Sequence, residues 1–238
     1  MSADTTTSAE GPVPALRDRA VACADRLRTA DRVLLASHID ADGLTSAAIA
    51  AAALERADIP FETVFAKQLD EREVARIAAT DHETVLFTDF GSGQLDVIAP
   101  YAAEGAFTPV VADHHQPADL PDGVDEPAHH LNPLLVGLDG ASELSGAGAS
   151  YVLARALEPE DADGHSPSAR ETGSHTGDNR DLAALAVVGA VGDMQAVGGE
   201  LVGANAGLVE EGIAADVLEE GTDLSLYGKQ TRPLPKLL

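Results

Sequence analysis

The sequence predicts an α/β domain with three layers, in which helices cover both faces of a parallel sheet and a helical part follows at the C-terminal end. Short apolar segments alternate with helical segments between residues 32 and 112. These short segments are continuously apolar, which is typical of strands buried on both faces. The composition, 45% apolar with 3% aromatic residues and no Trp, indicates an interior of Ala, Val and Leu.

The individual elements follow from the spacing of apolar residues along the chain. A first helix is predicted over residues 14–29. Strands are predicted at 32–37, 61–65, 84–88 and 108–112, and helices at 43–57, 70–79 and 94–103. A short strand is expected at 130–132, then a helix from 145 to about 157, a helix from 182 to 191, and more helix to about 218.

Three segments are expected to lie outside the domain, which then covers residues 13–220. Residues 1–12 are small and polar and lack the features of a signal peptide, so they are interpreted as a disordered tail. Residues 158–181 contain almost no large apolar side chain and are interpreted as a flexible acidic insertion. Residues 221–238 are basic and contain proline, as expected of a linker towards a missing C-terminal substrate-binding domain.

The composition of the chain indicates its cellular compartment. No segment approaches about 20 uninterrupted apolar residues, so no contact with a membrane is expected. The single cysteine, Cys23, excludes an internal disulfide and fits a cytoplasmic protein.

The net charge of −25 has two interpretations. It could mark a protein that repels anionic partners such as nucleic acid. It could also mark a halophilic protein, because 40 acidic residues are spread along the chain and only three of the 15 basic residues are lysines. We favour the second interpretation. At about 1 M salt the Debye length is roughly 3 Å, so the charge then excludes no anionic substrate.

Carboxylates and imidazoles follow three of the predicted strands at their C-terminal ends. Parallel strands end at a common edge, which is where α/β proteins bind ligands. Clustered anionic oxygens repel one another unless a cation lies among them, so the pattern predicts one or two divalent metal ions. The residues concerned are His38, Asp40 and Asp42 in the first loop, Asp89 in the second, and Asp113, His114 and His115 in the third.

The first two loops each have a structural alternative. Asp40 and Asp42 lie two apart, so in an extended loop both side chains could face one site. Asp42 could instead simply cap the helix that follows. Asp89 precedes a glycine-rich turn, which an aspartate could also cap.

The third loop is harder to explain without a ligand. His114 is the expected metal ligand, with Asp113 orienting its imidazole. His115 remains free to contact a phosphate oxygen or to move a proton. A second histidine pair, His129 and His130, is interpreted as structural.

A fourth segment is expected to supply Asp193 to the metal site. This carboxylate stands at the end of an apolar helix, where it needs a partner such as a metal ion. An oxygen-rich site with one or two imidazoles suits Mn²⁺, with Mg²⁺ as the alternative, better than tetrahedral Zn²⁺. Two such ions about 3.5–4 Å apart can generate hydroxide and stabilise both the attacking and the leaving oxygen at phosphorus. The expected metal ligands are His38, Asp40, Asp42, Asp89, His114 and Asp193.

The ordered motifs His-x-Asp-x-Asp-Gly, Asp-x-Gly-Ser-Gly, Asp-His-His and Gly-Asp-Met resemble the DHH phosphoesterase superfamily over about residues 30–200. Residues 37–46 and 88–94 are most similar to archaeal RecJ-like nucleases, a group that includes the GINS-associated nuclease. The resemblance implies Mn²⁺-dependent removal of nucleotides from the 5′ end of single-stranded DNA, or of RNA, with GINS or other replisome proteins as partners. It further implies that Asp89 bridges the two metal ions and that His115 contacts the scissile phosphate.

Two other functions stay open. One is a phosphoesterase for oligonucleotides or cyclic dinucleotides, since the few aromatic residues lie mostly on predicted strands and reveal no platform for stacking bases. The other is a non-catalytic replication scaffold built on the same fold.

Overall fold

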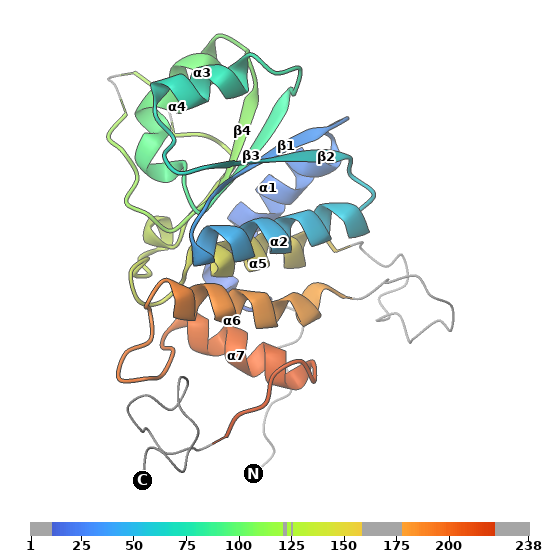
Figure 1. Ribbon diagram of the computed structural model, residues 1–238, viewed down its shortest axis with the longest axis vertical. Coiled ribbons are helices and arrows are strands. Elements are labelled where there is room, and N and C mark those ends of the chain that lie inside the picture. Colours follow the sequence, from blue (N-terminus) through green and yellow to red (C-terminus); the bar gives the residue numbers. More distant parts are fainter. Residues whose placement is uncertain (1–10, 121–122, 125, 159–177, 222–238) are drawn as a thin grey trace, which may run out of the picture.

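The computed structural model describes residues 11–120, 123–124, 126–158 and 178–221. Within them, five parallel strands form one sheet in the order β2-β1-β3-β4-β5 (Figure 1). The predicted strands are confirmed to within one residue at each end. They are β1 (Val33–His38), β2 (Phe61–Ala66), β3 (Thr84–Thr88), β4 (Thr108–Ala112) and β5 (His130–Leu131).

Helices pack on both sides of this sheet, as the sequence predicts (Figure 1). One side carries α1 (Arg17–Arg28), α2 (Ala41–Arg56) and α5 (Gly146–Ala156), and the other carries α3 (Glu71–Ala78) and α4 (Leu95–Ala103). α6 (Ala183–Gly192) packs on α2 and α5, and α7 (Ala204–Ala214) packs on α6. Among the described residues, no helix has both the length and the apolar character that a membrane span requires.

Alternation along the strands divides the interior into two cores. In β1, Leu35 belongs to the core under α1, α2 and α5, whereas Leu34 belongs to the core under α3 and α4. Successive side chains of a strand point to opposite faces, so a strand apolar at every position can fill both cores. The uninterrupted apolar runs in the sequence have this physical origin.

The start of α2 differs from the prediction. The helix begins at Ala41, and Asp40 is its N-cap, with a carboxylate oxygen that accepts a hydrogen bond from the Gly43 amide at 2.8 Å. Asp42 therefore lies in the first helical turn instead of an extended loop. The expectation that Asp40 and Asp42 point the same way from an extended segment is wrong, and so is the alternative that Asp42 caps the helix.

The C-terminal half also differs in two places. The helix predicted to continue to about 218 is interrupted, because residues 193–203 form turns and an isolated bridge between Val197 and Glu200. The proposed insertion ends earlier than 181, since Asn179–Leu182 form a 3-10 helix. Most of that insertion (159–177), the tail up to residue 10 and the proposed linker from 222 onwards lie outside the described residues.

The register of the sheet brings the functional loops to one level. Ser37, Thr88 and Ala112 are partners across β1, β3 and β4. Strand order also reverses between β1 and β3, and such a switch point opens a crevice at the carboxyl ends of the strands. The next residues at this level are His38, which ends β1, and Asp89 and Asp113, which come directly after β3 and β4.

Candidate metal centre

Side chains from four segments converge at the C-terminal edge of the sheet. Asp89, Asp113, His114 and His115 form one group whose potential ligand atoms lie within 4.8 Å of one another, and the expected metal ligands form two further groups of this kind. We call these two further groups subsite A and subsite B. Subsite A contains His38, Asp40 and Asp89, and subsite B contains Asp42, His114 and Asp193. The structure thus brings together all of the side chains that the sequence analysis nominates as metal ligands.

Asp89 lies between the two subsites. Its side chain is 1% exposed, with Oδ1 at 3.3 Å from Nε2 of His114 and Oδ2 at 3.6 Å from Nδ1 of His38. Neither carboxylate oxygen has a hydrogen-bond partner. The backbone at Asp89 has a φ of 58°, in the left-handed region that non-glycine residues seldom adopt. An unpaired buried carboxylate is costly, so this position suits a shared cation.

Both imidazoles direct one nitrogen at these carboxylates. In His114, Nδ1 donates to the Gly140 carbonyl at 2.6 Å, which leaves Nε2 in subsite B. In His38, Nε2 donates to the Lys67 carbonyl at 3.1 Å, which leaves Nδ1 at 2.9 Å from Asp40. A carbonyl that fixes the tautomer of a ligating histidine is a common support for a bound metal.

Asp42 is held by the start of α5. Its carboxylate oxygens accept hydrogen bonds from the backbone amides of Gly146 at 2.7 Å and Ala147 at 2.9 Å. A Cβ atom at Gly146 would lie 2.5 Å from Oδ1 of Asp89, so only glycine permits this approach. Through this contact the N-terminus of α5 contributes partial positive charge to a strongly acidic site.

Asp113 has a different role from the one expected. Its Oδ1 accepts hydrogen bonds from Nδ1 of His115 at 2.8 Å and from the His114 amide at 2.7 Å, and its Oδ2 accepts from the Ser92 amide at 2.8 Å. The expectation that Asp113 orients His114 is therefore wrong. The Asp113 carboxylate binds amides of its own loop and of the loop after β3, and the Gly140 carbonyl orients His114 in its place.

The pair of Asp113 and His115 is electrostatically matched. Burial alone would raise the pKa of Asp113, but the hydrogen bond from His115 and the charge of the nearby imidazoles hold that pKa below its usual range. The same hydrogen bond raises the pKa of His115. The His115 side chain is 54% exposed, so it can donate to a ligand beside the metal centre.

The remaining histidines fit the structural interpretation. His129 contacts the carbonyl of Ala22 at 3.1 Å, and the buried His130 contacts the Ser92 hydroxyl at 2.8 Å. Sequence reasoning missed the supporting residues Gly140 and Gln195. Gln195 stands two positions after Asp193, which is the one sequence signal that could have suggested a contact.

In the absence of a cation, the centre binds protons. Burial and the neighbouring carboxylates raise the pKa of Asp89 to about 9. Burial would lower the pKa of His114, but the Asp89 carboxylate 3.3 Å away and the hydrogen bond to the Gly140 carbonyl raise it to about 10. A divalent ion would take the place of these protons. The unpaired Asp89 oxygens and the inward nitrogens fit such an ion.

The fold and this site define a metal-dependent phosphoesterase, and comparison with known proteins gives the family. Residues 32–168 match the model of the DHH family, N-terminal domain, and the chain belongs to that family. It is 29% identical over 201 residues to an uncharacterized protein of Methanocaldococcus jannaschii, covering 80% of this chain and 40% of that protein.

Solved structures show the same fold. RecJ from Thermus thermophilus in complex with Mn²⁺ superposes with a TM-score of 0.61 at 25% identity, covering 86% of this chain and 28% of RecJ. An exonuclease RecJ bound to manganese gives a TM-score of 0.61 at 24% identity, covering 85% of this chain and 49% of that one. CDC45 from Entamoeba histolytica shares the fold, with a TM-score of 0.50 at 17% identity and coverages of 92% and 39%. The chain spans less than half the length of each of these relatives.

We predict that Asp89→Asn weakens Mn²⁺ binding at both subsites by about 100-fold. Mutation of residues that only support a metal ligand already lowers metal affinity by about 10–100-fold, and Asp89 would contact the ions itself. Asparagine keeps the shape and tolerates a positive φ, but it removes the charge that both subsites share. Isothermal titration with Mn²⁺ measures the effect. Asp58→Asn is the matched control, because Asp58 is exposed and also has a positive φ, 55°. Unchanged Mn²⁺ affinity in Asp89→Asn would refute the shared-ligand role.

We further predict that Mn²⁺ affinity rises between pH 6 and pH 9. The raised pKa values of Asp89 and His114 mean that protons compete with the metal, and each displaced proton adds up to about tenfold in affinity per pH unit. Titrations in buffers with different ionisation enthalpies count the protons released. A pH-independent affinity without proton release would contradict this account.

Proposed function

We propose that this chain is the catalytic part of a cytoplasmic, manganese-dependent, RecJ-like exonuclease that degrades single-stranded DNA, or RNA, from the 5′ end. The observation that carries the proposal is the position of Asp89, whose two unpaired oxygens face two separate groups of ligand atoms. A carboxylate shared in this way suits two ions, which act on the attacking and the leaving oxygen of a phosphodiester. Mn²⁺ is proposed as the ion, with Mg²⁺ as the alternative.

The chain's own residues would divide the work as follows. Asp40, Asp42, Asp193 and the two inward histidines would hold the ions on either side of Asp89. Bound divalent ions would supply a hydroxide nucleophile and electrostatic stabilisation. Asp113 engages Nδ1 of His115, so Nε2 is the nitrogen of that ring left to donate a hydrogen bond to a phosphate oxygen.

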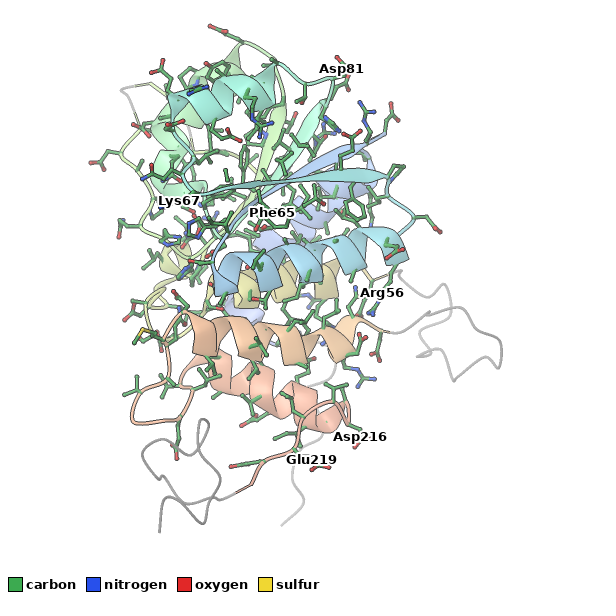
Figure 2. All side chains as sticks on the ribbon, viewed as in Figure 1. Arg56, Phe65, Lys67, Asp81, Asp216 and Glu219 are labelled. Atoms are coloured by element: carbon green, nitrogen blue, oxygen red, sulfur yellow. The ribbon has the colours of Figure 1, made fainter. Side chains whose placement is uncertain are left out.

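An exposed aromatic side chain near the centre supports a nucleic-acid substrate. Phe65 lies on the edge strand β2 and is 47% exposed, whereas the positions of the aromatic residues in the sequence reveal no platform for stacking bases. Lys67 follows at the end of the same strand, with its carbonyl against His38, and is the one lysine among the described residues (Figure 2). A base on Phe65 and a phosphate near Lys67 would match how proteins hold single strands.

Charge and motif resemblance support two finer proposals. The net charge of −25 supports the proposal that the protein comes from an organism of haloarchaeal type, with molar salt in its cytoplasm. The similarity of the motifs to GINS-associated nucleases supports replisome proteins as partners.

We predict Mn²⁺-dependent release of nucleotides from 5′-labelled single-stranded DNA in molar KCl. His115→Ala should lower kcat by about 10²–10⁴-fold, because it removes a positioned proton donor. His129→Ala, which lies outside the centre, should leave the rate unchanged. Hydrolysis of only very short oligonucleotides would favour the oligonucleotide phosphoesterase. A wild-type chain that binds Mn²⁺ but cleaves no phosphodiester would favour the non-catalytic scaffold.

We also predict that Phe65→Ala raises KM for single-stranded DNA by about tenfold, since stacking on one base contributes about 1–3 kcal/mol. Hydrolysis of bis(p-nitrophenyl) phosphate, which carries no base, should change far less. Tyr101→Ala on α4 is the control, because Tyr101 is a half-buried aromatic residue that packs against the core under α3 and α4. Equal effects of Phe65→Ala on the two substrates would exclude a stacking role.

A further inference from the structure

Two buried amide side chains lie behind subsite B. Gln195, in the turn after α6, is 1% exposed, and Asn205, in the first turn of α7, is fully buried. Neither is among the expected metal ligands. Both come from the part of the chain after residue 168, where the family model no longer matches.

Gln195 contacts one ligand of subsite B, Asp193, and the Gly140 carbonyl that supports a second ligand, His114. Its Nε2 donates to Oδ2 of Asp193 at 2.8 Å and to the Gly140 carbonyl at 2.9 Å. The same carbonyl accepts the hydrogen bond from Nδ1 of His114 at 2.6 Å. Gln195 thus touches Asp193 directly, and it shares with His114 the group that fixes the orientation of that imidazole.

The orientation of the Gln195 amide is set by Asn205. Oε1 of Gln195 accepts a hydrogen bond from Nδ2 of Asn205 at 2.7 Å. If the Gln195 amide were reversed, Oε1 would face the Asp193 carboxylate and the Gly140 carbonyl, and oxygen would meet oxygen at both contacts.

The partners of Asn205 indicate what this arrangement favours. Oδ1 of Asn205 is buried without a hydrogen-bond partner. The hydrogen bonds of this side chain are made by Nδ2, to Oε1 of Gln195 at 2.7 Å and to the Ser142 carbonyl at 3.5 Å. The shorter of the two, to Gln195, is made although the acceptor Oδ1 is left unpaired. Asp193 caps the end of α6 and is partly exposed, and among the described residues Gln195 is the one side chain that donates a hydrogen bond to it.

We propose that Gln195, oriented by Asn205, is a positioning residue for the metal ion of subsite B. It holds Asp193 and His114 at the separation that a shared ion requires, and it makes occupancy of subsite B depend on the docking of α7. The inference rests on the proposed function, because it assumes that the centre binds Mn²⁺.

Asn205→Asp tests the proposal at a distance from the ligands. A carboxylate can only accept, so the Gln195 amide is expected to reverse and to direct Oε1 at Asp193. We expect Mn²⁺ affinity at subsite B to fall by about 10–100-fold, with subsite A unchanged. Electron paramagnetic resonance should then show a single Mn²⁺ ion where the wild type shows two coupled ions. Asn205→Ser, which retains a donor, should preserve the coupled signal.

Asn179→Asp is the matched control. Asn179 is also buried, and its Nδ2 donates to the Ala154 carbonyl at 2.6 Å, away from the centre. We expect this variant to lower the melting temperature but to keep both ions. If Gln195→Glu and Asn205→Asp both bind two ions as the wild type does, or if Asn179→Asp loses subsite B equally, the positioning role is overturned.

The outcomes separate this inference from the proposed function. A wild-type chain that binds no Mn²⁺ would overturn the metal centre and this inference together. A wild-type chain that binds two ions but hydrolyses nothing would overturn the nuclease alone. Two ions in the wild type, in Gln195→Glu and in Asn205→Asp would overturn only the role of the amide pair.

Discussion

The buried carboxylate of Asp89 is the constraint on which the rest of the centre depends. An ionised carboxylate inside a protein is tolerated only with a partner, and this one has no donor within hydrogen-bonding geometry. Its neighbours include more carboxylates, so they increase the cost. A structure organised in this way needs positive charge from a ligand or from bound protons. Metal ions supply more of that charge than protons do, and they fit the nitrogens aimed at Asp89 from both sides.

Two aspartates at adjacent strand ends differ in how many hydrogen bonds their local contacts provide. Asp113 follows β4 and Asp89 follows β3, and both side chains are almost fully buried. Asp113 accepts hydrogen bonds from three backbone amides and one imidazole, and its pKa is lowered. Asp89 accepts none, and its pKa is raised to about 9. The saturated carboxylate stabilises its loop, whereas the unsaturated one is available for a ligand.

The sequence predicted the sheet, and it predicted which side chains gather at its edge, because both depend on short-range patterns. Apolar runs locate the strands, and strand ends locate the site. The directions of the side chains depend on longer-range contacts that no spacing reveals. Asp42 turns towards His114 because α2 begins two residues early and α5, more than a hundred residues later, supplies two amides. Gly140, which orients His114, lies 26 residues beyond it in a loop without a recognisable motif.

The overall charge of the chain and the local charge of the centre have different consequences for a polyanionic substrate. Two divalent ions would cancel the charges of Asp40, Asp42, Asp89 and Asp193, and the charge of a protonated His115 would balance that of Asp113, so the centre would carry no net charge. Salt at molar concentration screens the remaining acidic surface within roughly 3 Å. A phosphodiester would therefore be repelled only weakly along its approach and attracted at the metal ions. At this salt concentration, only charges within one Debye length of the centre act strongly on a bound substrate. An acidic surface is therefore compatible with an anionic substrate.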